Sequence, residues 1–266
     1  MTTSERRVLI TGGRGRLARA LSAAAWPQGW RPILLGRADL DVTDAAGVTA
    51  WVQDHRPALI INAAAFTGVD LAESERDPAF AVNATGAGNL AEAAEATGVD
   101  LIHVSTDFVF DGRRGRPYVE ADATAPLNVY GESKLEGERL VLQAHPQALI
   151  LRTAWLLGGQ GASFTDAILK RAARGEALRV VADQSGSPTD VSDLARAIVV
   201  AAKALALGPT PQRLYHVAGS EAATWHQIAE AAVKAWASQS GATPPSVTAI
   251  ASNDWPCPAQ RPQDSR

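Results

Sequence analysis

Short apolar runs alternate with longer amphipathic stretches along the first part of the chain. The runs are rich in Val, Ile and Leu and lie at 8–10, 32–35, 58–61, 101–104 and 148–151. Continuous apolar runs of this kind are typical of parallel strands that are buried on both faces. Helical segments separate them, at about 16–25 and most clearly in the Ala- and Glu-rich 78–97. This alternation predicts βαβ units and an α/β fold with a Rossmann-type, doubly wound parallel sheet.

The pattern becomes less regular after Arg152. Two helices are predicted there, at about 164–174 and 191–205, and Pro-rich turns follow at 208–211 and 243–245. We therefore expect a smaller C-terminal substrate lobe beside the main domain. The predicted division assigns 1–152 to the dinucleotide-binding domain, with 176–205 woven back onto it, and 153–175 and 206–266 to the substrate-binding lobe.

Composition narrows the class of protein. The formal net charge of −3 argues against a nucleic-acid or membrane-surface binder, which would carry a basic stripe. No apolar run reaches the roughly 20 residues that span a bilayer, and the N-terminus lacks the apolar segment of a signal peptide. The single cysteine, Cys257, allows no internal disulfide and no thiolate metal cluster. These features predict a cytoplasmic enzyme.

A glycine-rich loop follows the first predicted strand, at 11–18. Gly12 permits a tight turn, and Gly15 lets the backbone approach a pyrophosphate. Arg16 and Leu17 open the next helix, whose free N–H groups and partial positive charge suit phosphates. Glycine spacing alone is a weak signal, and the alternative is a plain strand–helix turn. Its place at the start of a βαβ series favours cofactor binding.

The end of the second predicted strand bears on the choice of cofactor. Enzymes that prefer NAD place a carboxylate there, on the ribose 2′-hydroxyl, whereas this strand ends in Leu-Leu-Gly-Arg. Arg37 and Arg14 are candidates to face a 2′-phosphate, which favours NADPH over NADH. The alternative is that both arginines are solvated surface groups. Asp41 and Val42, slightly further on, are candidates to flank the adenine.

Tyr130 and Lys134 are spaced at i and i+4, so they share one face of a predicted helix. A free tyrosine has a pKa of about 10, and a nearby ammonium would lower that pKa toward the range useful for acid–base catalysis. The spacing by itself is a common accident on helices. A second signal is needed, and the strand before this helix supplies it.

The apolar run at 101–104 ends in two hydroxyls, Ser105 and Thr106. Ligands in such sheets bind beyond the carboxyl ends of the strands. Side chains alternate along a strand, so only one hydroxyl is expected to point into the site. Thr106 is the first choice for hydrogen bonding a substrate carbonyl while Tyr130 delivers a proton, and Ser105 is the fallback. His103 is interpreted as a core histidine.

At this point the chain resembles a known family, the dTDP-4-dehydrorhamnose reductases, within the extended short-chain dehydrogenase/reductases. The resemblance runs in order through nearly the whole chain, in the segments 62–67, 69–75, 82–85, 105–112, 122–131, 152–155, 183–189 and 261–266. It implies the NAD(P)H-dependent reduction of the C4 keto group of a dTDP-4-keto-6-deoxysugar, a step of deoxysugar biosynthesis. The nucleotide sugar is then the partner, and which deoxysugar is used stays open.

The resemblance also implies roles for individual residues. The catalytic roles fall to Thr106, Tyr130 and Lys134, and Lys134 also holds the nicotinamide ribose. The residues implied to line the cofactor cleft after the third strand are Ala63, Ala64 and Ala65. Those implied to contact the substrate are Thr67, Val69, Asn128, Trp155 and Arg261, beside the hydroxyls of Ser105 and Thr106.

The chain departs from the family pattern at several positions. Ala18 stands where glycine is usual and Phe108 where tyrosine is usual, and members usually continue beyond the position of Arg266. Some members dimerise through a Mg²⁺ held by acidic side chains. Ala20 and Ser192 align with those positions, so we expect no such metal, and either a monomer or a homodimer.

Three other functions are known for proteins with this kind of sequence. Sugar-nucleotide dehydratases place Asp-Glu after the strand-end threonine, whereas Phe108 stands in the glutamate position here. Epimerases are disfavoured only because the eight segments given above resemble the reductases. The regulatory β subunit of methionine adenosyltransferase resembles the same reductases and acts by binding a partner, which leaves a non-catalytic binding subunit open.

Overall fold

The central feature of the computed structural model is a six-stranded, wholly parallel sheet. The structure describes residues 5–159, 161, 163–208 and 212–266. The strands of the sheet, in spatial order, are β2 Trp30–Leu35, β1 Arg6–Thr11, β3 Leu59–Asn62, β4 Asp100–Thr106, β5 Leu149–Thr153 and β10 Leu214–His216. The order reverses between β1 and β3, and such a switch point is where ligands bind in open α/β sheets.

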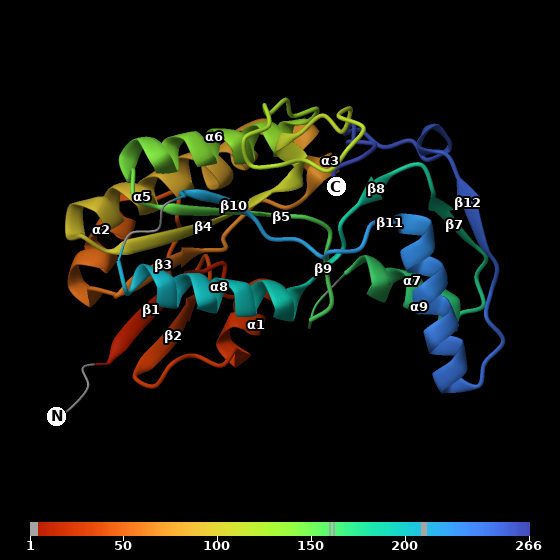
Figure 1. Ribbon diagram of the computed structural model, residues 1–266, viewed down its shortest axis with the longest axis horizontal. Coiled ribbons are helices and arrows are strands. Elements are labelled where there is room, and N and C mark those ends of the chain that lie inside the picture. Colours follow the sequence, from red (N-terminus) through yellow and green to blue (C-terminus); the bar gives the residue numbers. More distant parts are fainter. Residues whose placement is uncertain (1–4, 160, 162, 209–211) are drawn as a thin grey trace.

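Helices cover both faces of the sheet, as the fold class requires (Figure 1). On one face lie α1 Arg16–Ala23 and α8 Val191–Leu205; on the other lie α2 Ala45–His55, α5 Gly86–Thr97 and α6 Val129–Ala144. β1 shows why both layers are needed. Val8 and Ile10 pack with the α1 and α8 side, while Leu9 packs with the α2 and α5 side, and all three are fully buried. The predicted Rossmann-type fold is confirmed.

A helical connection leads from β3 to α5. It consists of α3 Val69–Ser74, α4 Arg76–Phe80 and a π-helical turn at Ala81–Thr85. The helix predicted at 78–97 therefore begins earlier and contains a π-turn. That turn brings the backbone oxygen of Asn83 so close to Gly137 of α6 that a Cβ there would lie 2.1 Å from it. Gly137 thus lets the two helices meet at this point.

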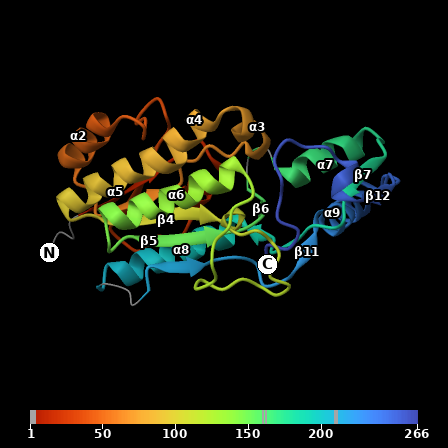
Figure 2. The same ribbon diagram turned by 90° about the horizontal axis from the view of Figure 1, so that it is seen from above.

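A smaller lobe lies beyond the carboxyl ends of β4 and β5 (Figures 1 and 2). Its core is built from α7 Phe164–Ala173, α9 Trp225–Ser240 and the parallel pair β7 Leu178–Val181 and β12 Val247–Ile250. Two-residue strands join it to the sheet: β6 Leu156–Leu157 with β9 Thr189–Asp190, and β8 Ser185–Gly186 with β11 Ala223–Thr224. Short 3-10 turns occur at Asp107–Val109 and Ser252–Asp254.

The chain crosses between the sheet and the lobe several times. α8, within 176–205, packs on the sheet, while β10, from the segment predicted to form the lobe, extends the sheet next to β5. We keep the two-part division as a proposal, with 214–216 on the sheet side of the boundary. Within the described ranges, no helix has both the length and the apolar character needed to cross a bilayer.

Candidate active site

The glycine loop sits tightly between β1, β2 and β3. Gly12 has a φ of +67°, and a Cβ there would lie 2.6 Å from the carbonyl oxygen of Ala63. Gly15 caps α1 without any side-chain hydrogen bond, and the first turn of α1 carries no acidic residue. The N-terminus of α1 therefore keeps its N–H groups free of side-chain acceptors. Such a loop and helix start fit a dinucleotide pyrophosphate.

Arg16 and Leu17 place their side chains away from that helix start. The Arg16 guanidinium donates to the carbonyl oxygens of Leu156 and Gly158, at 3.0 and 3.2 Å. Leu17 is buried in the core under α1. Only the backbone N–H groups of Arg16 and Leu17 can therefore make the predicted contact with the cofactor. The Arg16 side chain instead connects the glycine loop to β6.

Arg14 and Arg37 both lie at the end of β2. The Arg14 side chain passes Gly36, and Arg37 is 81% exposed and paired with Asp41 at 3.2 Å. The backbone N–H of Thr43, together with its hydroxyl and Arg37, lowers the pKa of Asp41. Val42 is buried against Gly86 of α5, so its side chain packs in the core. The two arginines are available for a phosphate at this edge.

We predict that Arg37→Ala weakens NADPH binding about tenfold and leaves NADH binding nearly unchanged. A hydrogen bond to a charged group contributes about 1.5 kcal/mol at the low end, and an exposed contact belongs there. Affinities measured by fluorescence titration test this. Arg31→Ala is the matched control, since Arg31 is also exposed on β2 and paired with a carboxylate, Glu5. Equal losses of affinity for NADPH and NADH would show that Arg37 is a solvated surface residue that does not bind the 2′-phosphate.

Thr106 and Tyr130 lie close together, and Lys134 follows Tyr130 one turn further along α6. Thr106 ends β4, and its hydroxyl neighbours the Tyr130 phenol. α6 carries both other residues, and its N-cap Asn128 accepts from the N–H of Gly131 at 2.8 Å. The choice of Thr106 over Ser105 for the catalytic role stays a prediction, and its place beside Tyr130 favours it. Ser105 points to the other side of β4, where it donates to Glu138 at 2.5 Å.

The electrostatics of Tyr130 differ from the expectation. Burial, and secondly the charge of Asp107, raise the pKa of Tyr130 to about 12, although the Thr106 hydrogen bond opposes this. Lys134 does not lower it, because its Nζ donates to the carbonyl oxygen of Val104 at 2.7 Å. Burial lowers the pKa of Lys134 itself to about 8. Tyr130 is therefore protonated at neutral pH, which is the state that a proton donor needs.

His103 is a core residue, as predicted. Its ring is fully buried, and its Nδ1 is hydrogen-bonded to the Asn62 side chain at 3.0 Å. Burial, together with the charge of Lys134, lowers its pKa well below the usual value. His103 is held neutral and outside the chemistry.

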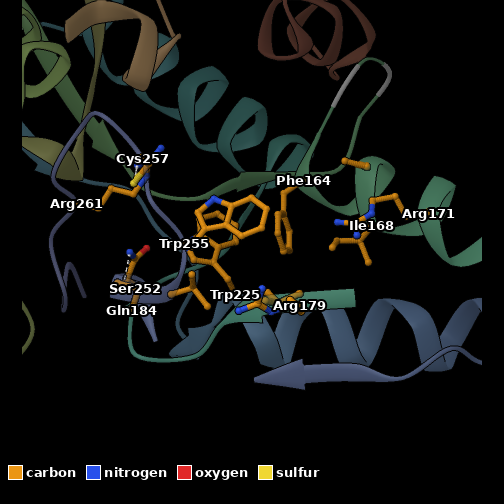
Figure 3. A pocket seen from close by; sticks show the side chains of 13 residues that line it. Phe164, Ile168, Arg171, Arg179, Gln184, Trp225, Ser252, Trp255, Cys257 and Arg261 are labelled. Atoms are coloured by element: carbon orange, nitrogen blue, oxygen red, sulfur yellow. Dashed lines mark hydrogen bonds between the residues drawn. The ribbon is translucent and has the colours of Figure 1, made fainter. Parts of the chain in front are cut away.

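An apolar cavity of about 300 Å³ opens in the smaller lobe (Figure 3). Its aromatic walls are Phe164, Trp225 and Trp255, and arginines stand at its rim (Figure 3). Arg261 is held by Asp70 of α3 through a 2.7 Å ion pair, so one wall of the cavity is anchored to the sheet domain. The cavity is thus lined by the lobe and by one residue tied to α3, and Thr106, Tyr130 and Lys134 are not among the described residues that line it.

Comparison with known proteins identifies the chain. A family model described as RmlD substrate binding domain matches residues 6–266. A dTDP-4-dehydrorhamnose reductase of Sinorhizobium fredii is 40% identical over 262 residues, which cover 98% of this chain and 88% of that protein. The chain belongs to the dTDP-4-dehydrorhamnose reductase family.

Other members of the reductase family extend the comparison. A probable dTDP-4,6-dihydroxy-2-methyloxan-3-one 4-ketoreductase of Streptomyces antibioticus is 39% identical over 254 residues, covering 95% of this chain and 85% of that one. The crystal structure of a Bacillus anthracis dTDP-4-dehydrorhamnose reductase in complex with NADP has a TM-score of 0.90 at 36% identity. The match covers 98% of this chain and 89% of that chain. The predicted family is confirmed.

The residues that the reductase family implied for substrate binding differ in exposure and in the contacts they already make. Thr67 is exposed, and Val69 begins α3. Asn128 is buried, and its amide already donates to the carbonyl oxygen of Gln260 at 2.7 Å. The Trp155 ring is stacked on Trp225, with centroids 3.8 Å apart and an interplanar angle of 6°. Asn128 and Trp155 therefore also hold the lobe in place.

Several residues of this reductase site were missed in the sequence. Asp107 is buried beside Thr106, and the C-terminal Ser265 donates to it at 2.6 Å. Asn83, in the π-turn, binds the backbone of Phe66 and the hydroxyl of Ser133. Asp107 and Asn83 both lie in segments that resembled the family, and that was the available signal. No sequence signal indicated Trp225, because Trp155, on which it stacks, is distant in the sequence.

Proposed function

We propose that the protein reduces the C4 keto group of a dTDP-4-keto-6-deoxysugar with NADPH. The observation that carries this is the placement of Thr106, at the end of β4, beside Tyr130 at the same sheet edge as the glycine loop. Membership in the reductase family and the NADP found in the Bacillus anthracis relative support it. We further propose that the enzyme acts in the cytoplasm, as a monomer or a homodimer.

The residues divide the work of ketone reduction. NADPH supplies the hydride when it is bound. Tyr130 donates a proton to the C4 oxygen as negative charge develops there, and the Thr106 hydroxyl orients both groups. The raised pKa of Tyr130, about 12, keeps the phenol protonated until that moment. Lys134 is proposed to hold the nicotinamide ribose; its buried Nζ is fixed by Val104.

The apolar cavity suits the nucleotide part of the substrate. Flat aromatic walls at Trp225 and Trp255 favour stacking with a base, and Arg179 offers positive charge for a diphosphate, while Arg171 is paired with Glu176. Arg261 is proposed to contribute through its fixed position rather than as a free cation, because Asp70 already neutralises it. The sugar then lies between this cavity and Tyr130, next to Trp155.

The test is NADPH consumption by the purified full chain with dTDP-4-dehydrorhamnose and with dTDP-4-keto-6-deoxyglucose, which differs from it in configuration at C3 and C5. We expect oxidation of NADPH with at least one of them, and faster turnover with NADPH than with NADH. Product NMR then gives the configuration at C4. An absence of turnover with every dTDP-4-keto-6-deoxysugar would refute the proposal, and tight co-purification with another enzyme would point to the binding-subunit alternative.

We predict that Trp155→Ala raises KM and lowers kcat, for a loss in kcat/KM of up to about 10²-fold, because a loosely held sugar misaligns its carbonyl. NADPH affinity should not change. Trp155 has a φ of +43°, a left-handed conformation that glycine tolerates best. The control Trp155→Gly should therefore have a free energy of unfolding about 1 kcal/mol larger than that of Trp155→Ala, and so be more stable, with the same kinetic defect. Unaltered kinetics would remove Trp155 from the substrate site.

A further inference from the structure

Asp107 is a buried carboxyl in direct contact with the catalytic pair. The Thr106 Oγ1 lies 3.1 Å from its Oδ1, within hydrogen-bond distance, and Thr106 also neighbours the Tyr130 phenol. The hydroxyl donates to Oδ1 when Asp107 is ionised, and the carboxyl O–H donates to the hydroxyl when Asp107 is protonated. Asp107 is only 7% exposed and is paired with no cation among the described residues. An isolated carboxylate is costly to bury, so this position favours the protonated acid.

The far side of Asp107 faces a second cavity. Its Oδ2 accepts from the Ser265 hydroxyl at 2.6 Å, and both residues line a cavity of about 470 Å³ under the ends of β5 and β10. This cavity is distinct from the apolar one in the lobe. Exposed residues at its rim, Pro117, Ser220 and Ala222, open it to solvent.

The lining of this second cavity is suited to water. Three buried polar atoms on its wall have no hydrogen-bond partner within the described part of the chain: Arg152 Nη1, Thr153 Oγ1 and His216 Nε2. A polar cavity of this size holds water molecules that satisfy such atoms. Solvent protons can therefore reach Ser265 and Asp107 through this cavity.

We propose that Asp107 is the proton source behind Tyr130, acting through the hydroxyl of Thr106. This rests on the proposed function. As Tyr130 gives its proton to the C4 oxygen, the Thr106 hydroxyl gives its own to Tyr130, and the Asp107 acid gives its proton to Thr106. The negative charge left by the reduction then rests on Asp107. A proton from cavity water restores the acid, so one solvent proton is consumed per ketone reduced.

The electrostatics agree with this direction of transfer. Burial raises the pKa of Asp107 to about 6, and the hydrogen bonds from Ser265 and Thr106 oppose that rise. A tyrosinate beside an ionised Asp107 would place two negative charges together, which is one reason why the pKa of Tyr130 is about 12. Charge on the carboxyl is the less costly outcome. The charged or titratable groups that face Asp107 or line its cavity are Tyr130, Tyr118, Arg152, His216 and Arg266.

Their charges are largely compensated. Arg152 is paired with Glu138 and Arg266 with Asp264, and burial lowers the pKa of His216. The pKa of His216, lowered from 6.5, and that of Lys134, lowered to about 8, fall in or near the same pH range. The activity change near pH 6 that Asp107→Asn removes is therefore the one assigned to Asp107, with the acid form active below the pKa and activity lost as the pH rises through it.

The experiment measures single-turnover hydride transfer from NADPH between about pH 5 and about pH 9. We expect the wild-type rate to fall as the pH rises through about 6. Asp107→Asn should be about 10²-fold slower at low pH, without that inflection and with unchanged NADPH affinity. Ser265→Ala should keep the inflection but move it to higher pH, since the lost hydrogen bond lowered the pKa of Asp107. Asp111→Asn is the matched control, because Asp111 bonds Tyr118 instead.

A purely structural role for Asp107 would slow the reaction without moving the inflection. A rate for Asp107→Asn within a few-fold of wild type, or an inflection that survives it, would overturn the proposal. A readout independent of turnover is the ¹³C resonance of Tyr130 in labelled protein, assigned with Tyr130→Phe. It should show a step near pH 6 that Asp107→Asn abolishes. A missing step would refute the link even if the substrate class were wrong.

Discussion

Tyr130→Phe is expected to lower kcat by about 10²–10⁴-fold, the contribution of a positioned general acid. The phenylalanine ring keeps the edge-to-face contact with Phe108, whose centroid lies 5.5 Å away, and loses only the hydroxyl that Thr106 binds. Packing and NADPH affinity should therefore stay close to wild type. Steady-state kinetics and cofactor titration check both.

Tyr215→Phe is the control for this substitution, since Tyr215 lies in β10 with its ring packed against the core on the other face of the sheet. It should keep wild-type kinetics. If Tyr130→Phe stayed within a few-fold of wild-type kcat, Tyr130 would not be the acid. A loss of NADPH affinity equal to the loss of kcat would instead indicate a collapsed cleft.

The second large effect is on stability. Glu138 and Arg152 form a buried pair through two hydrogen bonds, at 2.8 and 2.7 Å, between α6 and β5. Glu138→Ala leaves the Arg152 guanidinium buried and unpaired, so we expect the free energy of unfolding to fall by about 3–5 kcal/mol. Urea-induced unfolding followed by circular dichroism measures it.

Glu136→Ala is the matched control on the same helix. Glu136 pairs with Arg139 at 2.6 Å on the exposed face of α6, and such surface pairs contribute at most about 1 kcal/mol. Replacing Glu138 and Arg152 together by methionine should recover most of the stability, because no charge is left unpaired. If Glu138→Ala lowered the free energy of unfolding as little as Glu136→Ala does, the Arg152 guanidinium would be hydrated in the variant and the prediction would be wrong.

The elements with strong local patterns were predictable. The five apolar runs became β1 to β5, and α7 and α8 lie within a residue of their predicted ends. β10 is three residues long and becomes a strand only because β5 offers it an edge. A local signal did exist for α9, whose start carries a capping box of Thr224 and Gln227. Its hydrophobic partners come from distant segments, so its packing could not be predicted.

In the site, the residue types were predictable and their orientations were not. The strand end and the Tyr-Lys spacing pointed to Thr106 and Tyr130, which lie close together; their catalytic roles stay a prediction. The direction of Lys134 depends on the carbonyl oxygen of Val104, which no sequence pattern reveals. The stacking of Trp155 on Trp225 likewise depends on Gly186, where a Cβ would lie 2.2 Å from the Trp155 ring. Such contacts follow from tertiary packing alone.

The anchoring of the segment 259–266 also bears on the order in which the protein matures. All six strands of the sheet precede residue 217, so a growing chain can form the sheet domain before this segment leaves the ribosome. Arg261 and Ser265 then bind Asp70 and Asp107 after the sheet domain has formed. The glycine loop and α1 are therefore in place before these two contacts join the lobe side of the site to the sheet.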